Sequence, residues 1–273
     1  MSSEAAPVTV SAPPVLPSVP IILGAPERLF GLTELVVKAD GSIAGTMPTG
    51  PWLSGPDGRG EVAGLGLLID DVLGYAAVQL ADGWALSTEV SVDMVGTVPV
   101  DGSRVHCVAR VVHEDTTGPL VSGEVLHDDG QVLAHCTLRG RLVGTYPTPA
   151  LSPDRLLLPS PAVAADLDAL LGDDFVPGQD GARVTVGSGF ANPLGNLHGG
   201  MAFCFLERVA ARAMPAPGRT ASVRMQLVRA APVGSVLHLE AVRVHRGRTL
   251  GVVQVVSRDE AGRVGAIATV TRH

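Results

Sequence analysis

Apolar positions along the chain form two kinds of run, one typical of buried helices and one typical of β-strands. The segments 61–79 and 198–213 are apolar over many consecutive positions and contain no proline, so each predicts a helix. Shorter valine-rich runs, such as 104–112 and 249–256, lie between turn signals and predict strands. Each half of the chain therefore reads as a short strand region, one helix and then four strands.

The two halves repeat each other in the same order, about 132 to 136 residues apart. The matching positions are a glycine before a strand, a helix segment and a glycine-led strand: Gly102 with Gly234, 62–71 with 198–207, and 130–138 with 262–270. A single match arises easily by chance, but three in register predict a duplicated module. One helix with an antiparallel sheet, present twice, is an α+β arrangement.

The duplication predicts four segments. Prolines interrupt the first residues, which we expect to form a flexible arm rather than a signal peptide. Prolines are also frequent at both ends of the segment that joins the modules. The expected boundaries are 1–27 for the arm, 28–146 for the N-terminal module, 147–181 for a linker with a short helix over 162–171, and 182–273 for the C-terminal module.

Composition narrows the class of protein. Hydrophobic residues make up 46% of the chain and charged residues 17%, so a sizeable core is expected. The net charge is −7, Lys38 is the only lysine and the arginines are scattered, which argues against a nucleic-acid partner. The apolar runs are interpreted as too short for a membrane span of about 20 residues. The widely spaced thiols of Cys107, Cys136 and Cys204 favour a reducing cytoplasm over a disulfide framework or a zinc site.

One segment combines residue types that carry chemistry. Asn192 is followed six residues later by His198-Gly199-Gly200, and an acid, Glu207, lies in the helix that begins there. These residue types and spacings resemble the phenylacetyl-CoA-type branch of the hotdog-fold thioesterases. The resemblance implies a tandem double hotdog, an acyl-CoA thioester as substrate, hydrolysis to a free acid and coenzyme A, and no cofactor beyond the substrate itself.

Physical chemistry explains why a thioesterase would use such a segment. A helix N-terminus exposes unpaired N–H groups and a partial positive charge, which stabilise the oxyanion of a thioester under attack. Gly199 and Gly200 leave the backbone open to the carbonyl group. A carboxylate then serves as general base or as nucleophile. Glu207 lies nine residues past His198, about 13 Å further along the helix. Such an acid can serve only the start of a second helix that packs antiparallel to its own.

The two halves do not carry equal motifs. In the first half, Val62-Ala63-Gly64 stands at the His-Gly-Gly position, and Pro56 stands where the asparagine would be. The acid survives as Asp71. We therefore expect one complete composite site and a second site that is weak or inactive.

The complete site is expected to combine residues of both modules. Its catalytic candidates are Asp71, Asn192, His198 and Gly199, with Gly200 and Thr88 as substrate-binding residues. The weaker site would use Glu207 as its acid, with Ser222 beside it. Asp70 is the alternative to Asp71, because only one of two neighbouring aspartates on a helix is expected to face the site.

Three functions remain open from the sequence. The leading hypothesis is an acyl-CoA thioesterase, and the second is a protein that binds acyl thioesters without hydrolysing them. The third is a hotdog hydratase, for which Asp101 and His106 have the required spacing although they lie at a turn entering a strand. The acyl group, the choice between CoA and a carrier protein, and homo-oligomerisation of double hotdogs are not specified. Candidate arginines for the CoA phosphates are Arg224, Arg229, Arg246 and Arg248.

Overall fold

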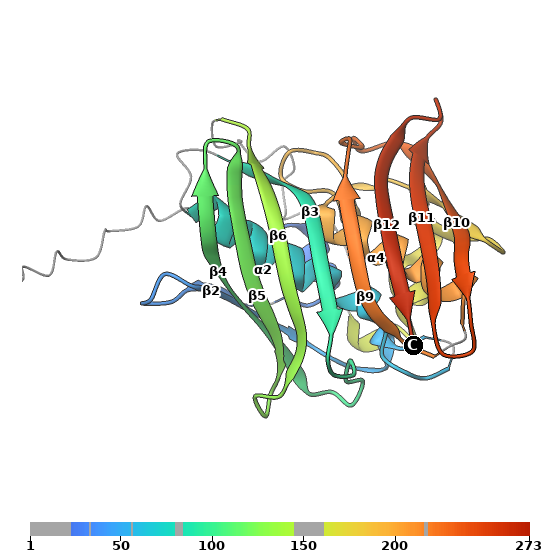
Figure 1. Cartoon of the computed structure of the whole chain (residues 1–273), viewed down its shortest axis with the longest axis horizontal. Helices are drawn as coiled ribbons and strands as arrows, with labels where there is room; N and C mark the ends of the chain where they lie inside the picture. Colours follow the sequence, from blue (N-terminus) through green and yellow to red (C-terminus); the bar gives the residue numbers. More distant parts are fainter. Residues whose placement is uncertain (1–22, 33, 56, 80–83, 145–160, 216–217) are drawn as a thin grey trace, which may run out of the picture.

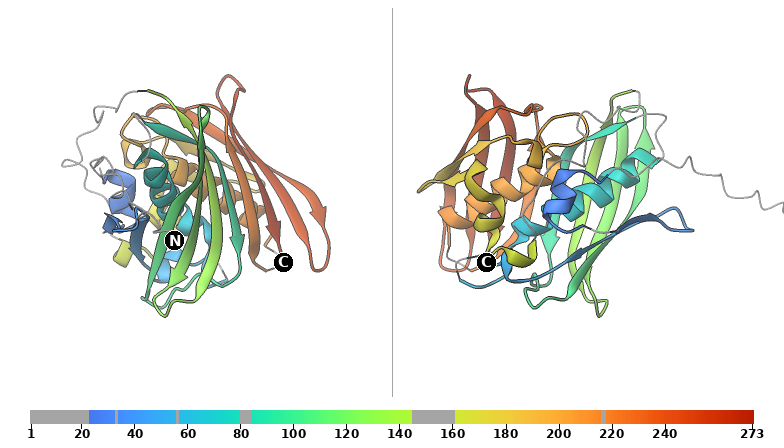
Figure 2. Two further views of the ribbon diagram at one scale, coloured as in Figure 1. Left: turned by 60° about the vertical axis from the view of Figure 1, so that its left-hand side comes forward. Right: turned by 180° about the vertical axis from the view of Figure 1, so that it is seen from behind.

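A single antiparallel sheet of twelve strands curves around two central helices (Figure 1). The computed structural model describes residues 23–273 except 33, 56, 80–83, 145–160 and 216–217. Seen from behind, both helices lie on the same face of the sheet (Figure 2). This face is where the two modules meet.

The N-terminal module contains six strands around one long helix. A short helix, α1 (Ala25–Leu29), comes first, and the 3-10 turn η2 (Val62–Leu65) leads directly into the long helix α2 (Gly66–Gln79). The strands are β1 (Glu34–Val37), β2 (Ile43–Pro48), β3 (Ala85–Met94), β4 (Arg104–Asp115), β5 (Gly118–His127) and β6 (Val132–Leu142), and a further 3-10 turn is η1 (Pro51–Leu53).

The C-terminal module has the same content. Its long helix is α4 (Gly199–Ala213), and the short helix α3 (Leu167–Leu171) precedes it. The strands are β7 (Phe175–Pro177), β8 (Gly181–Thr185), β9 (Thr220–Leu227), β10 (Val236–Arg246), β11 (Gly251–Asp259) and β12 (Val264–Arg272), with 3-10 turns η4 (Pro161–Val163), η5 (Gly172–Asp174) and η6 (Ser188–Phe190).

The strand order shows the duplication directly. The order β1-β2-β4-β5-β6-β3 in the first module is followed by β9-β12-β11-β10-β8-β7, which is the equivalent order reversed. Strands β3 and β9 join the modules as antiparallel neighbours, with Val92 opposite Val223. The predicted α+β double hotdog, in which each module is one long helix wrapped by an antiparallel sheet, is confirmed.

The pattern of buried side chains differs between the strands and the long helices. Along β12 the side chains of Ala266, Ala268 and Val270 are buried while the residues between them are partly exposed, as expected when one face of a sheet covers a core. Every residue of α2 except Gly74 is buried. A charged side chain in these helices must therefore be compensated inside the protein.

The two long helices meet at their first turns and run antiparallel. The acid Asp70 lies against the start of α4 at Gly200, and the acid Glu207 lies against Ala63 at the start of η2. The crossing is close because glycines form it. A Cβ atom added at Gly66 would lie 2.8 Å from the carbonyl oxygen of Gly200. This contact places an acid of each helix beside the start of the other.

Three expectations about segments need correction. The arm was expected to reach residue 27, but α1 begins at Ala25 and Ala25, Pro26 and Glu27 are buried; residues 1–22 lie outside the described part of the chain. The linker 147–181 contains β7, so the C-terminal module begins earlier than residue 182. The linker helix is limited to Leu167–Leu171, because Asp166 caps its start by accepting a hydrogen bond from the Ala169 N–H.

The expectation that every apolar run is too short to span a membrane does not hold for the first long helix segment. By length and composition, Val62–Gln79 could cross a membrane, and it is the only such segment among the described residues. In the fold, 94% of this segment is buried inside the protein, which is the position of a core helix.

Substitution at the helix crossing tests the closeness of the contact. We expect Gly66→Ala to lower the free energy of unfolding by about 1–3 kcal/mol, because the new methyl group would lie 2.6 Å from the ring of Phe203. Gly74→Ala in the same helix meets nothing within 4 Å and should stabilise by roughly 0.5–1 kcal/mol. Urea unfolding of both variants measures the difference, and equal effects would refute the close crossing.

Candidate active site

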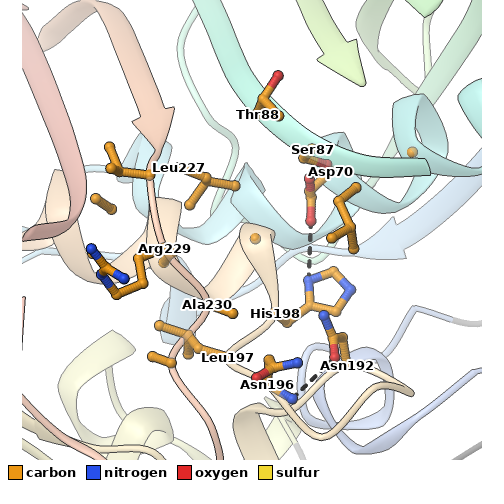
Figure 3. Close-up of a pocket in the computed structure, with 18 of the residues that line it drawn as sticks. Asp70, Ser87, Thr88, Asn192, Asn196, Leu197, His198, Leu227, Arg229 and Ala230 are labelled. Carbon is orange, nitrogen blue, oxygen red and sulfur yellow. Dashed lines mark hydrogen bonds and ion pairs between the residues drawn. The ribbon is translucent and has the colours of Figure 1, made fainter. Parts of the chain in front are cut away.

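The start of α4 forms one wall of the candidate site. The loop before it is held by Asn192, whose Oδ1 accepts hydrogen bonds from the N–H groups of Leu194 at 3.0 Å and Asn196 at 3.2 Å. His198 occupies the N-cap position, and the helix begins at Gly199. Because Asn192 uses its oxygen to fold the loop, its amide N–H₂ group faces the site as a donor (Figure 3).

Asp70 reaches this helix start from the other module. Its Oδ2 accepts a hydrogen bond of 2.8 Å from the Gly200 N–H, and its Oδ1 accepts one of 2.6 Å from the Ser87 hydroxyl. A Cβ atom added at Gly199 would lie 2.6 Å from Asp70 Oδ2. Glycine is therefore required here for a carboxylate to approach the backbone, and the contact joins α2, β3 and α4 in one site.

The imidazole of His198 lies between carboxylates. Its Nδ1 is 3.2 Å from Asp70 Oδ2, its Nε2 is 3.2 Å from Asp71 Oδ1, and Glu27 Oε1 is 3.9 Å from the same Nε2. Burial opposes protonation of the ring, but the charges of Asp71, Asp70 and Glu27 outweigh it and raise the pKa of His198 to about 10. The raised pKa favours the imidazolium form of the ring. The Gly200 N–H lies 2.8 Å from Asp70 Oδ2 and 3.1 Å from His198 Nδ1, so it donates to Asp70 in this form and can donate to the histidine only when Nδ1 has lost its proton.

Two of these acids have unusual environments. Glu27 in α1 is 2% exposed and Asp71 in α2 is 4% exposed. Burial, and after it the charge of Asp71, raises the pKa of Glu27 to about 7. Burial also raises the pKa of Asp71, against the lowering effect of His198. No motif in the sequence pointed to Glu27, which α1 brings into the site.

A pocket of about 280 Å³ opens from these polar groups into the space between the helices and the sheet. Its inner lining is mostly apolar and comes from both modules: Tyr75, Val78, Trp84, Ala202, Leu206, Leu227, Leu237 and Leu239. Two exposed arginines, Arg141 and Arg229, also line it. An elongated apolar group with a polar end and an anionic tail would match this distribution.

Most of the predicted site residues come together here. The structure gathers Asp71, Asn192, His198, Gly199 and Gly200 around one pocket, together with the alternative acid Asp70. Figure 3 shows the Asp70 carboxylate pointing at the His198 ring. Both neighbouring aspartates therefore contact the site, although only one was expected to do so.

The predicted hydroxyl partners were displaced by one or two positions. Thr88 lines the pocket, but its hydroxyl donates to the Arg139 carbonyl, and Ser87 is the residue bonded to Asp70. In the second module Thr220, rather than Ser222, donates to Glu207 at 2.5 Å. Each strand has a register shift at this point, so simple strand alternation predicts the wrong hydroxyl.

Glu207 lies in the symmetry-related position and repeats the contacts of Asp70. Its Oε2 accepts a hydrogen bond from the Ala63 N–H at 3.1 Å, and its Oε1 accepts from Thr220. Ala63 is thus equivalent to Gly200, and Glu61 is equivalent to His198. The expected alignment of Val62-Ala63-Gly64 with His-Gly-Gly is wrong by one residue, and Pro56 lies outside the described residues.

The site around Glu207 carries charges of opposite sign to those of the site around Asp70. Glu61 stands where the first site has His198, and Arg208 stands where it has Asp71. Arg208 is 1% exposed and donates to both oxygens of Glu61, at 2.6 and 2.8 Å, and to both oxygens of Asp168, at 2.8 and 2.9 Å. Arg272 adds a second guanidinium, 3.8 Å from Glu207, where β6 of the first module has Gly140 opposite Ser87. These ion pairs fill the place that His198 and Asp71 take in the first site.

The other sequence candidates lie elsewhere. Asp101 accepts a hydrogen bond from the Ser103 N–H, while His106 pairs with Asp128 at 2.7 Å, so the hydratase spacing does not bring Asp101 and His106 together. Arg224 pairs with Asp93 at 2.7 Å. The three thiols are buried and unpaired, and burial raises their pKa values.

One group of described residues satisfies the distances of a metal site. Ligand atoms of Glu27, Asp71 and His198 lie within 4.8 Å of one another, and all three residues are buried. The contact of 3.2 Å between Asp71 and His198 joins opposite charges, so it is an ion pair and leaves no ligand atom of His198 free on that side.

Comparisons with known proteins agree with this arrangement. Residues 189–273 match a family model described as the acyl-CoA thioesterase N-terminal domain. No curated protein matches the sequence. Among solved structures, a tesB protein of Mycobacterium avium subsp. paratuberculosis superposes with a TM-score of 0.60 at 13% identity, covering 91% of this chain and 98% of that one.

Two further structures are similar at the level of the fold. The 12:0-ACP thioesterase from Umbellularia californica has a TM-score of 0.59 at 14% identity, covering 85% of this chain and 94% of that one. A MaoC-like dehydratase has a TM-score of 0.56 at 11% identity, covering 81% and 86%. The fold alone therefore does not separate thioesterase from hydratase.

The solved structures share the fold of this chain, which is a tandem double hotdog. Its C-terminal module, which carries the His-Gly-Gly segment, is the part that matches the acyl-CoA thioesterase family model.

The ion pairs of Arg208 with Glu61 and Asp168 should contribute to the stability of the fold. We expect Arg208→Met to lower the free energy of unfolding by about 3 kcal/mol, because it leaves the largely buried carboxylate of Glu61 without its cation, while Asp168 keeps its ion pair with Arg212. The matched control is Arg263→Met, which removes a pair that is 62% exposed on the arginine side and should cost at most about 1 kcal/mol. Chemical denaturation compares them. An Arg208 variant as stable as the control would show that the network is not structural.

Proposed function

We propose that this protein is a thioesterase that hydrolyses acyl-CoA to a free acid and coenzyme A at the site formed by Asp70, Asp71 and His198. One observation carries the proposal. A carboxylate of the N-terminal module lies within 2.8 Å of the backbone N–H of Gly200 at the start of the C-terminal helix. That arrangement combines a base with an oxyanion-stabilising helix terminus, as thioester hydrolysis requires.

The thioester oxygen would bind at the N-terminus of α4. The Gly199 N–H has no acceptor among the described residues, and the side chain of this residue offers no steric barrier. The helix dipole and the neighbouring His198 imidazolium both add positive charge where the oxyanion develops. The amide N–H₂ group of Asn192 supplies another donor at the same wall of the pocket.

Asp70 is the carboxylate best placed to act on the thioester. It removes a proton from water while the water oxygen attacks the carbonyl carbon. The C–S bond breaks as the carbonyl reforms, and Asp70 returns the proton to the thiolate of coenzyme A. The Ser87 hydroxyl and the Gly200 N–H hold the carboxylate in place. Asp71, which the sequence favoured as the acid, instead pairs with His198 and orients the ring.

The remaining features of the pocket suit an acyl-CoA. The apolar lining of both modules would hold the acyl chain, and the exposed arginines Arg141 and Arg229 would meet the CoA phosphates. The proposal assigns every step to side chains, backbone and water, so it requires no cofactor. A cytoplasmic location follows from the free thiols as part of the same proposal.

Neutral replacement of each aspartate tests the assignment of the base. Asp70→Asn should lower kcat for acyl-CoA hydrolysis by about 10²- to 10⁴-fold, because amides do not accept the proton from water. Asp71→Asn should cost less, because it weakens only the ion pair that orients His198. Thiol release from acyl-CoA measures both rates. A larger loss for Asp71→Asn would exchange the roles of the two residues.

The symmetry-related acid provides a control within the same chain. Glu207→Gln should leave kcat within a few-fold of wild type once its thermal stability has been checked, because the second pocket beside Glu207 has Glu61 and Arg208 in place of His198 and Asp71. If Glu207→Gln is inactive and Asp70→Asn is active, the sites are assigned the wrong way round. If wild-type protein binds acyl-CoA but releases no thiol, it is a binding protein.

The rim arginines test the choice of CoA as the carrier of the acyl group. Arg229→Ala should raise KM for acyl-CoA by roughly five-fold, about 1 kcal/mol of binding free energy. The same acyl group on N-acetylcysteamine, which has no phosphates, should show an unchanged KM. An identical KM for acyl-CoA in variant and wild type would exclude a phosphate contact at Arg229.

A further inference from the structure

Glu27 is the acid in the site that neither the sequence motif nor the proposed reaction uses. It comes from α1, which packs against η6 and α2, and it is 2% exposed. Its Oε1 lies 3.9 Å from His198 Nε2, beyond hydrogen-bond distance, and its Oε2 has no hydrogen-bond partner among the described residues. A buried carboxylate with so few donors is costly to ionise.

The charges facing Glu27 show which acid should hold a proton. From α2 it faces Asp71, from the start of α4 it faces His198, and η6 carries no ionisable side chain. Asp70 contacts the other nitrogen of the His198 ring. On α1 itself the neighbouring charge is the exposed Arg28. Three carboxylates thus surround one imidazolium. Asp70 accepts two hydrogen bonds, whereas one oxygen of Asp71 and one of Glu27 have no hydrogen-bond partner among the described residues. Asp71 lies 3.2 Å from the ring nitrogen and Glu27 3.9 Å, so Glu27 is further from the cation and is the less stabilised of these two as an anion.

We propose that Glu27 is a positioning residue that acts through His198: it is a neutral carboxylic acid in the active protein, and hydrolysis falls when it loses this proton as the pH rises through neutrality. The inference rests on the proposed thioesterase function. Once ionised, Glu27 would offset the positive charge of His198 beside the helix start where the oxyanion forms. In a buried site such a charge acts with little screening by solvent.

The pKa of Glu27 lies in the pH range that the proposal requires and is shifted in the direction that it requires. Burial and then Asp71 raise its pKa from 4.5 to about 7. A folded-state pKa above the unfolded value means that the native protein binds the proton more tightly. The stability that this proton contributes is therefore fully present below pH 4.5 and is lost as the pH rises through about 7.

The test compares Glu27→Gln, which imitates the protonated acid, with wild type over the neutral pH range. In wild type, kcat should decline on the alkaline side with an inflection near the pKa of Glu27. In Glu27→Gln that inflection should be lost while activity in the acidic part of the range is retained. Glu34→Gln on β1, where the glutamate is exposed, is the matched control and should keep the wild-type profile. A Glu27→Gln profile that superposes on wild type would overturn the proposal.

A second measurement does not depend on activity. Infrared difference spectra between about pH 6 and pH 8 should show loss of the C=O stretch of buried carboxylic acids in wild type. Because burial also raises the pKa of Glu61 to about 7, the Glu27 band is the part of this loss that is missing from the spectra of Glu27→Gln. If wild type hydrolyses no thioester, the proposed function fails, yet this band still decides whether Glu27 holds the proton. Absence of the band overturns the inference, and so does a stoichiometric metal ion bound by the protein in place of the proton.

Discussion

The hydrogen bond between the carboxylate of one long helix and the backbone N–H at the start of the other is the contact on which this structure depends. Asp70 makes it to Gly200, and Glu207 makes it to Ala63. It satisfies two helix N-termini and two buried acids at once, and it requires the helices to cross antiparallel at their first turns. A double hotdog is needed because neither module can provide both partners.

The two copies of this hydrogen bond lie in different surroundings. In one copy the N-cap residue is His198, paired with Asp71, and a pocket opens beside Asp70. In the other the N-cap residue is Glu61, which pairs with Arg208, and the linker helix α3 adds Asp168 to the same guanidinium. The second copy keeps the packing function of the contact while its polar groups bind one another. Chemistry and structural support are thereby divided between the two copies.

The fold and most of the site were predictable because they depend on long periodic patterns and a motif with defined spacing. The positions of the helices, the duplication and the group around His198 required only sequence. The predictions that were wrong concern single residues. Register shifts in β3 and β9 brought Ser87 and Thr220, rather than Thr88 and Ser222, to the acids. The charge reversal at Glu61 and the approach of Glu27 depend on tertiary contacts between distant segments, which periodicity does not report.

The most direct test of the account is a crystal structure with an acyl-CoA analogue in which a methylene group replaces the thioester sulfur. The account predicts one analogue per chain, with its ketone oxygen at the Gly199 N–H, its carbonyl carbon beside Asp70, and its acyl chain in the apolar pocket between the helices. An analogue bound at the Ala63 and Glu207 position instead, or equally at both positions, would contradict the division of roles between the two copies.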